Sequence, residues 1–187
     1  MTDRDRALPP LTATRVHHVG MSVASVDRAL AFWEPFLGTK ARWRTVLDRP
    51  YLGRHVGYPG VKIDAAFIDL PGGNVLELLD YHVEDKKPGS EWTANPGNVH
   101  ICLSVENTRS ARERAIALGA RPVAPEGAIE IDGGPNKGAV VSYLRVHDGI
   151  TLELYQPAAK SQAAPGDGHS VDARGSGAPE PLLQDPR

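Results

Sequence analysis

Two segments of the chain with the same alternation of apolar and polar positions lie 82 residues apart. Residues 18–23 read His-Val-Gly-Met-Ser-Val, and residues 100–105 read His-Ile-Cys-Leu-Ser-Val. Alternation with a period of two predicts a β-strand that buries one face. Recurrence of the pattern indicates a fold assembled from two similar units. Each unit is therefore expected to begin with a strand.

An amphipathic helix is predicted after each of these strands. Apolar residues recur at intervals of three or four over residues 26–37 and again over residues 111–118. Ser25 stands at the expected N-cap of the first helix, and Asn107 or Thr108 at that of the second, because their side-chain oxygens can accept hydrogen bonds from free backbone N–H groups. Both segments end in Leu-Gly, which is a common way for a helix to stop.

Each predicted helix is followed by a turn-rich segment and then by two strands with a tight connection. Pro-Gly-Gly-Asn separates the strands of the first pair, and His-Asp-Gly separates those of the second. We therefore predict an α+β fold of two tandem βαβββ modules that form a curved mixed sheet around a cavity, with the helices on the outer face. The expected strands of the two pairs are 65–70 with 75–79 and 140–146 with 150–155, and further strands are expected near 42–47 and 123–131.

The distribution of glycine, proline and apolar residues divides the chain into five segments. It has 187 residues with 19 Gly and 16 Pro, and both ends lack the large apolar side chains that a core needs. We predict a loose N-terminal arm over residues 1–14, a first module over 15–82, a linker over 83–97, a second module over 98–157 and a disordered tail over 158–187.

Composition narrows the classes of function. The formal net charge is −2, and no run of Lys and Arg alternates with aromatic residues, so nucleic-acid binding has little electrostatic support. The apolar stretches are far shorter than a membrane span, and the N-terminus has no signal-peptide core. Cys102 is the single cysteine, so no internal disulfide can form. We expect a cytoplasmic protein that binds a small molecule, and neither nucleic acid nor membrane.

Strand alternation places two histidines and two glutamates on the face opposite the helices. The bulky apolar residues of the repeated strands must meet the helices, which leaves His18 and His100 on the other face. Glu77 and Glu153 each stand between two leucines in the closing strands and point to the same side. Burying these groups without partners would be costly, so a compensating cation is expected. A hydrogen-bonded or salt-bridged cluster is the alternative.

Two His and two Glu form a ligand set that suits one divalent ion of zinc, nickel, cobalt, manganese or iron. Octahedral geometry would leave two positions open for water or substrate. His17 has the opposite strand phase from His18, and we expect it to have a structural or surface role. His147 precedes Asp-Gly in a predicted hairpin turn and is not expected to be a ligand.

Two loops are candidates for substrate binding. The first contains Arg49, Arg54 and Tyr58, which could meet an anionic or aromatic substrate, and the alternative is a solvated crossover. The second, residues 132–138, is rich in glycine and could form a mobile cover with Lys137 at its tip. An ordinary hairpin turn is the alternative for this loop.

The repeated motifs resemble those of the vicinal oxygen chelate superfamily, which includes glyoxalases, methylmalonyl-CoA epimerases, extradiol dioxygenases and antibiotic resistance proteins. The resemblance covers residues 15–157. It implies paired βαβββ modules and a metal held by His18, Glu77, His100 and Glu153. The motifs that carry it are residues 16–23, 75–79, 98–105 and 149–157.

A complete set of four ligands favours the glyoxalase and epimerase branch, because extradiol dioxygenases use two His and one Glu on iron. Residues 47–60 contain no glutamate, so the usual base of the CoA-ester epimerases has no counterpart there. We expect an isomerase or lyase that acts on a substrate with two adjacent oxygens through a metal-stabilised enolate, with Glu77 or Glu153 as the base.

Two other functions remain open at this point. One is an Fe(II)-dependent dioxygenase of the extradiol kind, and the other is a non-catalytic small-molecule binding or resistance protein. A homodimer is expected from the fold class. The sequence leaves open whether the two modules pair within one chain or exchange across the dimer.

Overall fold

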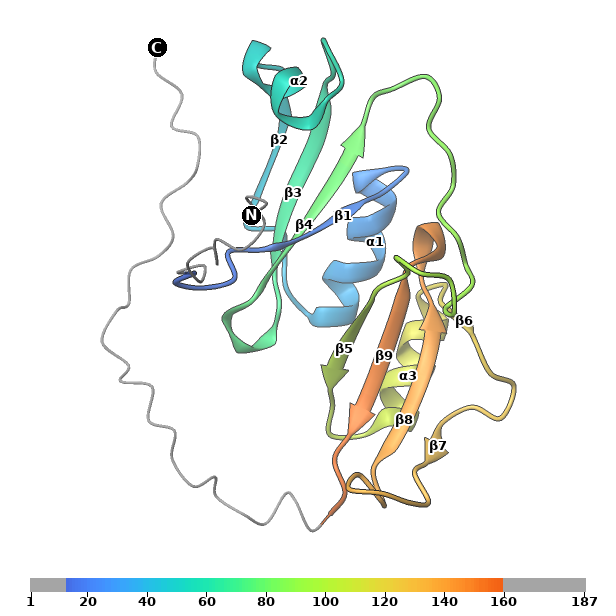
Figure 1. The fold of residues 1–187 in the computed structure, drawn as a ribbon. Helices are drawn as coiled ribbons and strands as arrows, with labels where there is room; N and C mark the ends of the chain where they lie inside the picture. Colours follow the sequence, from blue (N-terminus) through green and yellow to red (C-terminus); the bar gives the residue numbers. More distant parts are fainter. Residues whose placement is uncertain (1–12, 160–187) are drawn as a thin grey trace, which may run out of the picture.

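The computed structural model describes residues 13–159 of the 187-residue chain (Figure 1). The arm predicted over residues 1–14 and the tail predicted over 158–187 lie almost entirely outside the described residues. Within residues 13–159, no helix is long and apolar enough to span a membrane. The α+β class and the curved sheets are confirmed.

The first half of the chain forms a four-stranded sheet with the order β1-β4-β3-β2. Strand β1 runs parallel to β4, and the other neighbours are antiparallel. The elements in chain order are β1 (Val19–Ser22), α1 (Val26–Leu37), β2 (Trp43–Leu47), α2 (Pro50–Val56), β3 (Ile63–Asp69), a 3-10 turn (Pro71–Gly73) and β4 (Val75–Tyr81).

The second half repeats this plan in a separate sheet with the order β5-β9-β8-β6, in which β7 also pairs with β8. Strand β5 runs parallel to β9, as β1 does to β4. The elements are β5 (His100–Ser104), α3 (Thr108–Ala117), β6 (Arg121–Pro122), β7 (Ile129–Glu130), β8 (Val140–Arg145), a 3-10 turn (His147–Gly149) and β9 (Thr151–Gln156). Among the described residues the strands pair only within their own half, so the sheet is in two parts.

The two long helices begin where the capping residues predicted. Ser25 Oγ accepts a hydrogen bond of 3.3 Å from the backbone N of Arg28, and Asn107 Oδ1 accepts one of 3.0 Å from Ser110 N. Gly38 follows α1 with a φ of 71°, a left-handed conformation that costs little without a Cβ. These local signals position the helices relative to the strands that precede them.

Two segments differ from the expected pattern. The loop expected around residues 49–60 contains α2, which begins at Pro50 and is followed by Gly57 with a φ of 80°. Of the strand expected near residues 123–131, only the two-residue strand β7 forms, and the two-residue strand β6 precedes that segment. Pro125 has no N–H to donate to a ladder, and Gly127 adopts a φ of 87°, so a continuous strand cannot form there.

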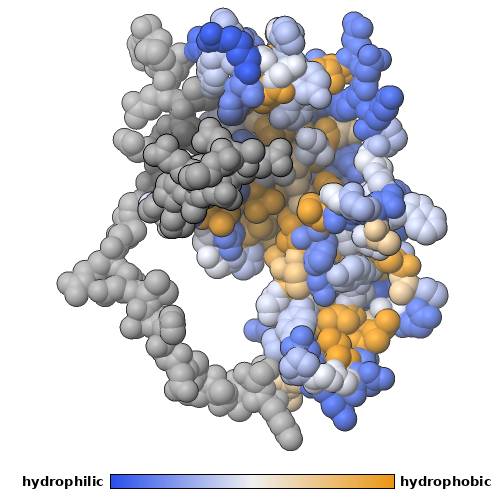
Figure 2. All heavy atoms as spheres, viewed as in Figure 1, coloured by the Kyte–Doolittle hydropathy of each residue, from blue (hydrophilic) through white to orange (hydrophobic). Residues whose placement is uncertain are grey.

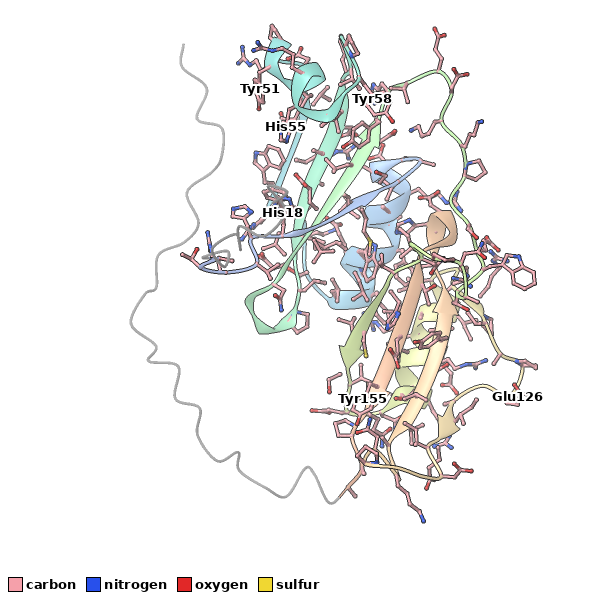
Figure 3. The ribbon with its side chains drawn as sticks, viewed as in Figure 1. His18, Tyr51, His55, Tyr58, Glu126 and Tyr155 are labelled. Carbon is pink, nitrogen blue, oxygen red and sulfur yellow. The ribbon has the colours of Figure 1, made fainter. Side chains whose placement is uncertain are left out.

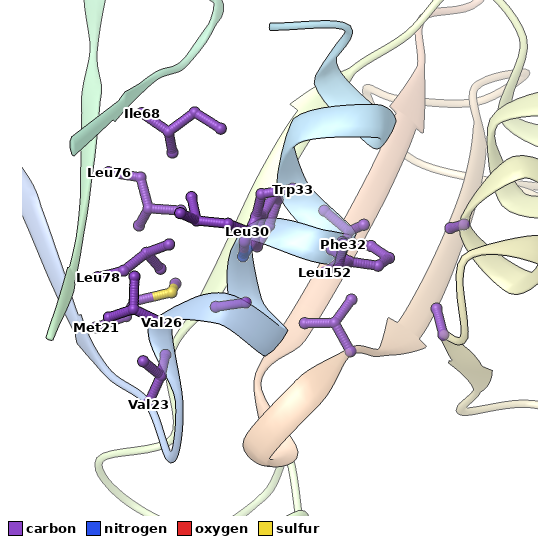
Figure 4. Packing of buried hydrophobic residues seen from close by; sticks show 14 of the residues in the cluster. Met21, Val23, Val26, Leu30, Phe32, Trp33, Ile68, Leu76, Leu78 and Leu152 are labelled. Atoms are coloured by element: carbon purple, nitrogen blue, oxygen red, sulfur yellow. The ribbon is translucent and has the colours of Figure 1, made fainter. Parts of the chain in front are cut away.

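Helix α1 lies between the two sheets and packs against both (Figure 4). On one side it lies against Leu76 and Leu78 of β4, and on the other Phe32 approaches Leu152 of β9, whose sheet is also covered by α3. Trp33 of α1 is completely buried in this cluster. The two halves of the chain therefore share one hydrophobic core instead of having one each.

This shared core decides the direction of the neighbouring glutamates. Because successive side chains of a strand point to opposite faces, Glu77 points away from the core that holds Leu76 and Leu78. Glu153 likewise points away from the core that holds Leu152 and Leu154. The glutamate-bearing face of each sheet is consequently the face turned away from this core.

A buried hydrogen bond joins the halves at one end of this core. The indole Nε1 of Trp33 donates to Nε2 of His147 over 2.9 Å. His147 Nδ1 lies 3.0 Å from Asp148 Oδ2, which also accepts a 3.2 Å hydrogen bond from the backbone N of Ala24. The turn between β8 and β9 is thus fixed against α1 and against the segment before it.

Replacing Trp33 with Phe is expected to lower the free energy of unfolding by about 1 to 3 kcal/mol, since it leaves the buried Nε2 of His147 without a donor. Urea denaturation measures the change. Trp92→Phe is the matched control, because Trp92 is 75% exposed and its replacement should change stability by less than about 0.5 kcal/mol. Equal effects of the two substitutions would contradict this role of Trp33.

The pH dependence of stability offers a second check on this turn. Burial lowers the pKa of His147 below its usual 6.5, although Asp148 opposes the shift. The unfolded chain then takes up the proton more readily than the folded chain, so the folded state loses stability as the pH falls below 6.5. The decline in unfolding free energy between about pH 7.5 and 5.5 should be steeper in the wild type than in His147→Gln. Parallel curves would exclude His147 as the titrating group.

Candidate metal centre

His18 and Glu77 form the first of two matched polar pairs. His18 directly precedes β1, and Glu77 lies in the neighbouring parallel strand β4. His18 Nε2 lies 3.0 Å from Glu77 Oε2, and the two side chains are 33% and 16% exposed. Burial raises the pKa of the Glu77 carboxyl, while His18 and His17 oppose this rise. Positive charge at this position therefore stabilises a half-buried carboxylate.

His100 and Glu153 form the second pair in the same way. They come from the parallel strands β5 and β9, and His100 Nε2 lies 3.0 Å from Glu153 Oε2. Cys102 stands directly opposite Glu153 in the strand register. Burial, and then the nearby Glu153, raises the pKa of the Cys102 thiol to about 11. This thiol is protonated at neutral pH.

An aromatic ring lies beside the histidine of each pair. The Phe67 ring lies 5.8 Å from the His18 ring, and the Tyr143 ring lies 5.3 Å from the His100 ring, measured between centroids. Neither ring was identified from the sequence as part of the site. Both stand ten residues before the glutamate of their pair, so aligning the two halves at their glutamates would have found them.

His17 departs from its expected position. The strand alternation that would direct it toward the helices begins only at Val19. The Nδ1 atoms of His17 and His18 lie 2.8 Å apart, and the His17 ring lies 6.5 Å from that of Phe67. One Nδ1 must donate and the other accept, so His17 influences which nitrogen of His18 carries a hydrogen.

The structure brings the four expected ligands together as two pairs, and it does not bring the pairs together. Among residues 13–159, no group of three or more His, Cys, Asp or Glu side chains is close enough to hold one metal ion. The position of α1 accounts for this separation, because Glu77 and Glu153 point away from the core that both halves share.

The donor chemistry of the pairs fits a divalent ion. Each pair presents an imidazole nitrogen and a carboxylate oxygen in contact with one another. Zinc, nickel, cobalt, manganese and iron all accept such nitrogen and oxygen donors. A single pair offers two donors, and the four donors of a complete set require both pairs.

The expected substrate-binding residues lie at the ends of the two sheets. Arg49 is the N-cap of α2, Arg54 is exposed on that helix, and Tyr58 follows it. The Tyr58 ring lies 6.0 Å from the Tyr81 ring at the end of β4. Lys137 is exposed in the turn before β8. Figure 3 shows Tyr58 beside α2, at the opposite end of the molecule from Tyr155 of β9.

A cavity of about 710 Å³ lies between α1, the linker, the end of α3 and the turn before β9, and none of the four expected ligands lines it. Its walls include Phe32 of α1, Gly89 of the linker and His147 of the turn before β9. This cavity is therefore not part of the candidate metal centre.

Residues 17–137 match the family model of the glyoxalase/bleomycin resistance protein/dioxygenase superfamily. The matched segment covers more than half of the chain and contains His18, Glu77 and His100. The chain belongs to this superfamily. A comparison with curated protein sequences finds no match.

Solved structures show the same fold at low sequence identity. A glyoxalase family protein from Bacillus cereus is similar with a TM-score of 0.63 and 22% identity, over 81% of this chain and 99% of that one. A glyoxylase/bleomycin resistance protein/dioxygenase domain from a Frankia species gives a TM-score of 0.55 at 21% identity, over 78% and 99%. A glutamate-to-glutamine mutant of glyoxalase I from Zea mays gives 0.55 at 18% identity, over 77% of this chain and 46% of that one.

Proposed function

We propose that the protein is a metal-dependent isomerase or lyase of the glyoxalase and epimerase type, located in the cytoplasm, that acts on a small substrate with two adjacent oxygens. The observation that carries the proposal is the duplicated pair, in which an imidazole and a half-buried carboxylate meet at 3.0 Å at equivalent positions of both halves. Membership of a superfamily that includes glyoxalases supports it.

His18, Glu77, His100 and Glu153 would hold one divalent ion. When bound, such an ion polarises a substrate carbonyl and so favours loss of the neighbouring proton. Glu77 or Glu153 would be the base for that proton, because each carboxylate lies beside one of the histidines that would hold the ion. Residues 47–60 contain no glutamate that could take this role instead. Phe67 and Tyr143 pack against the two histidines and limit their movement.

The complete site requires two chains in this proposal. Within one chain, α1 would have to leave one of its two sheets before the pairs could meet, which would expose Trp33 and the leucines that it contacts. Pairing the first half of one chain with the second half of another brings one pair of each kind together and leaves both cores intact. A two-fold symmetric dimer then holds two equivalent sites.

Glu77→Gln and Glu153→Gln are each expected to lower the metal content and to cut turnover at least about a hundredfold, because each removes a ligand and a base. Elemental analysis of protein purified without chelator measures the metal, and the hemithioacetal of methylglyoxal and glutathione is the first substrate to assay. Glu113→Gln, on the exposed side of α3, is the matched control and should behave as the wild type.

The same measurements decide between the functions left open by the sequence. Metal content and turnover within twofold of wild type in both glutamate variants would overturn the assignment of the site. Stoichiometric iron with oxygen consumption in the presence of a catechol would favour the dioxygenase. A wild-type protein that binds its ligand without metal would favour the binding or resistance protein.

Mixing two inactive variants tests whether the site is shared between chains. His18→Ala with Glu77→Gln destroys the first pair, and His100→Ala with Glu153→Gln destroys the second. If sites are shared, random exchange of subunits should restore about one quarter of the wild-type metal content, because half of the dimers are mixed and each mixed dimer has one intact site. Restoration is impossible if each site lies within one chain. Each variant assayed alone is the control.

A further inference from the structure

The face of the first sheet that carries Glu77 has a regular set of neighbours on β2 and β3. In the strand register, Glu77 lies opposite Phe67, which lies opposite Trp43. Leu79 and Tyr81 are the next two residues of β4 whose side chains point to the same face as Glu77. Because side chains of a strand alternate, all of these residues share one face. We call Trp43, Phe67, Leu79 and Tyr81 the apolar wall.

The apolar wall is continuous with the first His–Glu pair. The ring centroids of Trp43 and Phe67 are 5.1 Å apart, and Phe67 lies 5.8 Å from His18. All four side chains of the wall are half-buried, so they keep surface that a ligand could cover. On the other side of Phe67, the guanidinium of Arg42 lies over its ring at 5.6 Å and pairs with Asp69 at 3.0 Å.

Helix α2 closes the far end of this face. Leu52 of α2 and Val61 after it form a buried cluster with Ile63 and Ala65 of β3. Tyr81 packs against the same cluster, and burial raises its pKa above the usual value of 10.0. The part of the face left for a ligand therefore lies between α2 and the His18–Glu77 pair. Figure 2 shows hydrophobic atoms at the surface in the middle of the molecule, where β1, β3 and β4 cross in Figure 1.

Among the described residues, β2, β3 and β4 place no charged side chain on this part of the face. From Glu77 toward α2, the positions of β2, β3 and β4 that share the face are occupied by uncharged residues. They are Trp43, Thr45, Leu47, Ile63, Ala65, Phe67, Leu79 and Tyr81. A charged or strongly hydrated group would lose its water here without gaining a partner.

The second half differs at the equivalent positions. Tyr143 stands where the first half has Phe67, and Tyr155 stands where it has Leu79. Cys102 lies opposite Glu153, whereas Gly20 lies opposite Glu77. The second half thus has two phenolic hydroxyls and a thiol on this face. The first half has none of these groups at the matching positions. The two halves of the site are chemically different.

The geometry points to a substrate whose aromatic ring is bonded to a carbon that bears one of its two adjacent oxygens, the ring lying on the apolar wall between α2 and Phe67. The polar part of the substrate lies toward Tyr143 and Tyr155 of the second half. Aromatic side chains recognise such a ring by stacked or edge-to-face contacts as well as by covering its surface. This inference rests on the proposed function, because the oxygens are taken to bind at the His–Glu pairs.

Two hydroxamates test this preference in the metal-loaded protein. Acetohydroxamate and benzohydroxamate present the same two adjacent oxygens and differ in a methyl against a phenyl group. Calorimetry should find that benzohydroxamate binds at least about tenfold more tightly, because the phenyl ring buries more apolar surface. In Trp43→Thr and Leu79→Thr the ratio should fall below about threefold while acetohydroxamate binds as in the wild type.

Val46→Thr is the matched control, because Val46 lies on the same strand β2 as Trp43 but is 52% exposed on the opposite face. It should leave the ratio of the two affinities unchanged. If Trp43→Thr does not fold, Leu79→Thr gives the same comparison. Equal binding of the two hydroxamates by the wild type, or an unchanged ratio in a folded wall variant, would overturn the inference and leave the proposed function standing.

A metal-free measurement separates the two ideas. The fluorescence anisotropy of 2-naphthol, a neutral aromatic, should show saturable binding to the metal-stripped protein that Leu79→Thr weakens at least about fivefold and Val46→Thr does not. If neither hydroxamate binds the metal-loaded protein, the proposed function fails. The 2-naphthol measurement then decides by itself whether the apolar wall binds an aromatic ring. Absence of 2-naphthol binding would then overturn the aromatic preference as well.

Discussion

The packing of α1 against two sheets at once is the constraint on which the rest of the structure depends. A helix usually covers one sheet with one apolar stripe, whereas α1 buries Leu30 toward the first sheet and Phe32 toward Leu152 of the second, and its Trp33 donates a hydrogen bond to His147 of the second half. Burying a large apolar side chain stabilises a fold by about 1.5 to 3 kcal/mol. Separating α1 from either sheet would forfeit several such contributions, so the relative position of the two halves is strongly fixed.

That fixed position has a direct effect on the candidate metal centre. A strand that places Leu76 and Leu78 in the core must place Glu77 outside it, and the same holds for Glu153 between Leu152 and Leu154. Each pair therefore lies on an outer face, with carboxylates only 16% and 18% exposed. In the proposed dimer, a second copy of the chain would complete each of these two equivalent half-sites.

Local structure could be predicted from the sequence because its signals are local. Ser25 and Asn107 begin their helices as expected, and the alternation around Glu77 and Glu153 places both on the face opposite the leucines. Helix α2 was not predicted, because its segment contains the prolines and glycines that are typical of loops. The hydrogen bond between Trp33 and His147 joins residues 114 apart, and no periodic pattern indicates such a contact.

The relative position of the halves could not be predicted for a similar reason. Periodicity shows which face of a strand is buried, but it does not show which helix covers that face. The sequence indicates the position of the halves only through the width of the apolar surface of α1. Phe32 and Phe36 fall outside the stripe formed by Val26, Leu30 and Trp33, and their rings stack with centroids 5.3 Å apart. A helix with apolar residues over so wide an arc must be covered on more than one side.

The difference between the two halves also bears on how a shared site would work. If the first halves of two chains faced each other, the site would have two apolar walls. If the second halves of two chains faced each other, the site would have two surfaces with phenolic hydroxyls. Pairing unlike halves gives every site one surface with Phe67 and Leu79 and one with Tyr143 and Tyr155. A substrate with an apolar end and a hydrogen-bonding end can then bind in only one orientation. The differences between the repeated halves would thus give a site with a symmetric set of ligands two unlike ends.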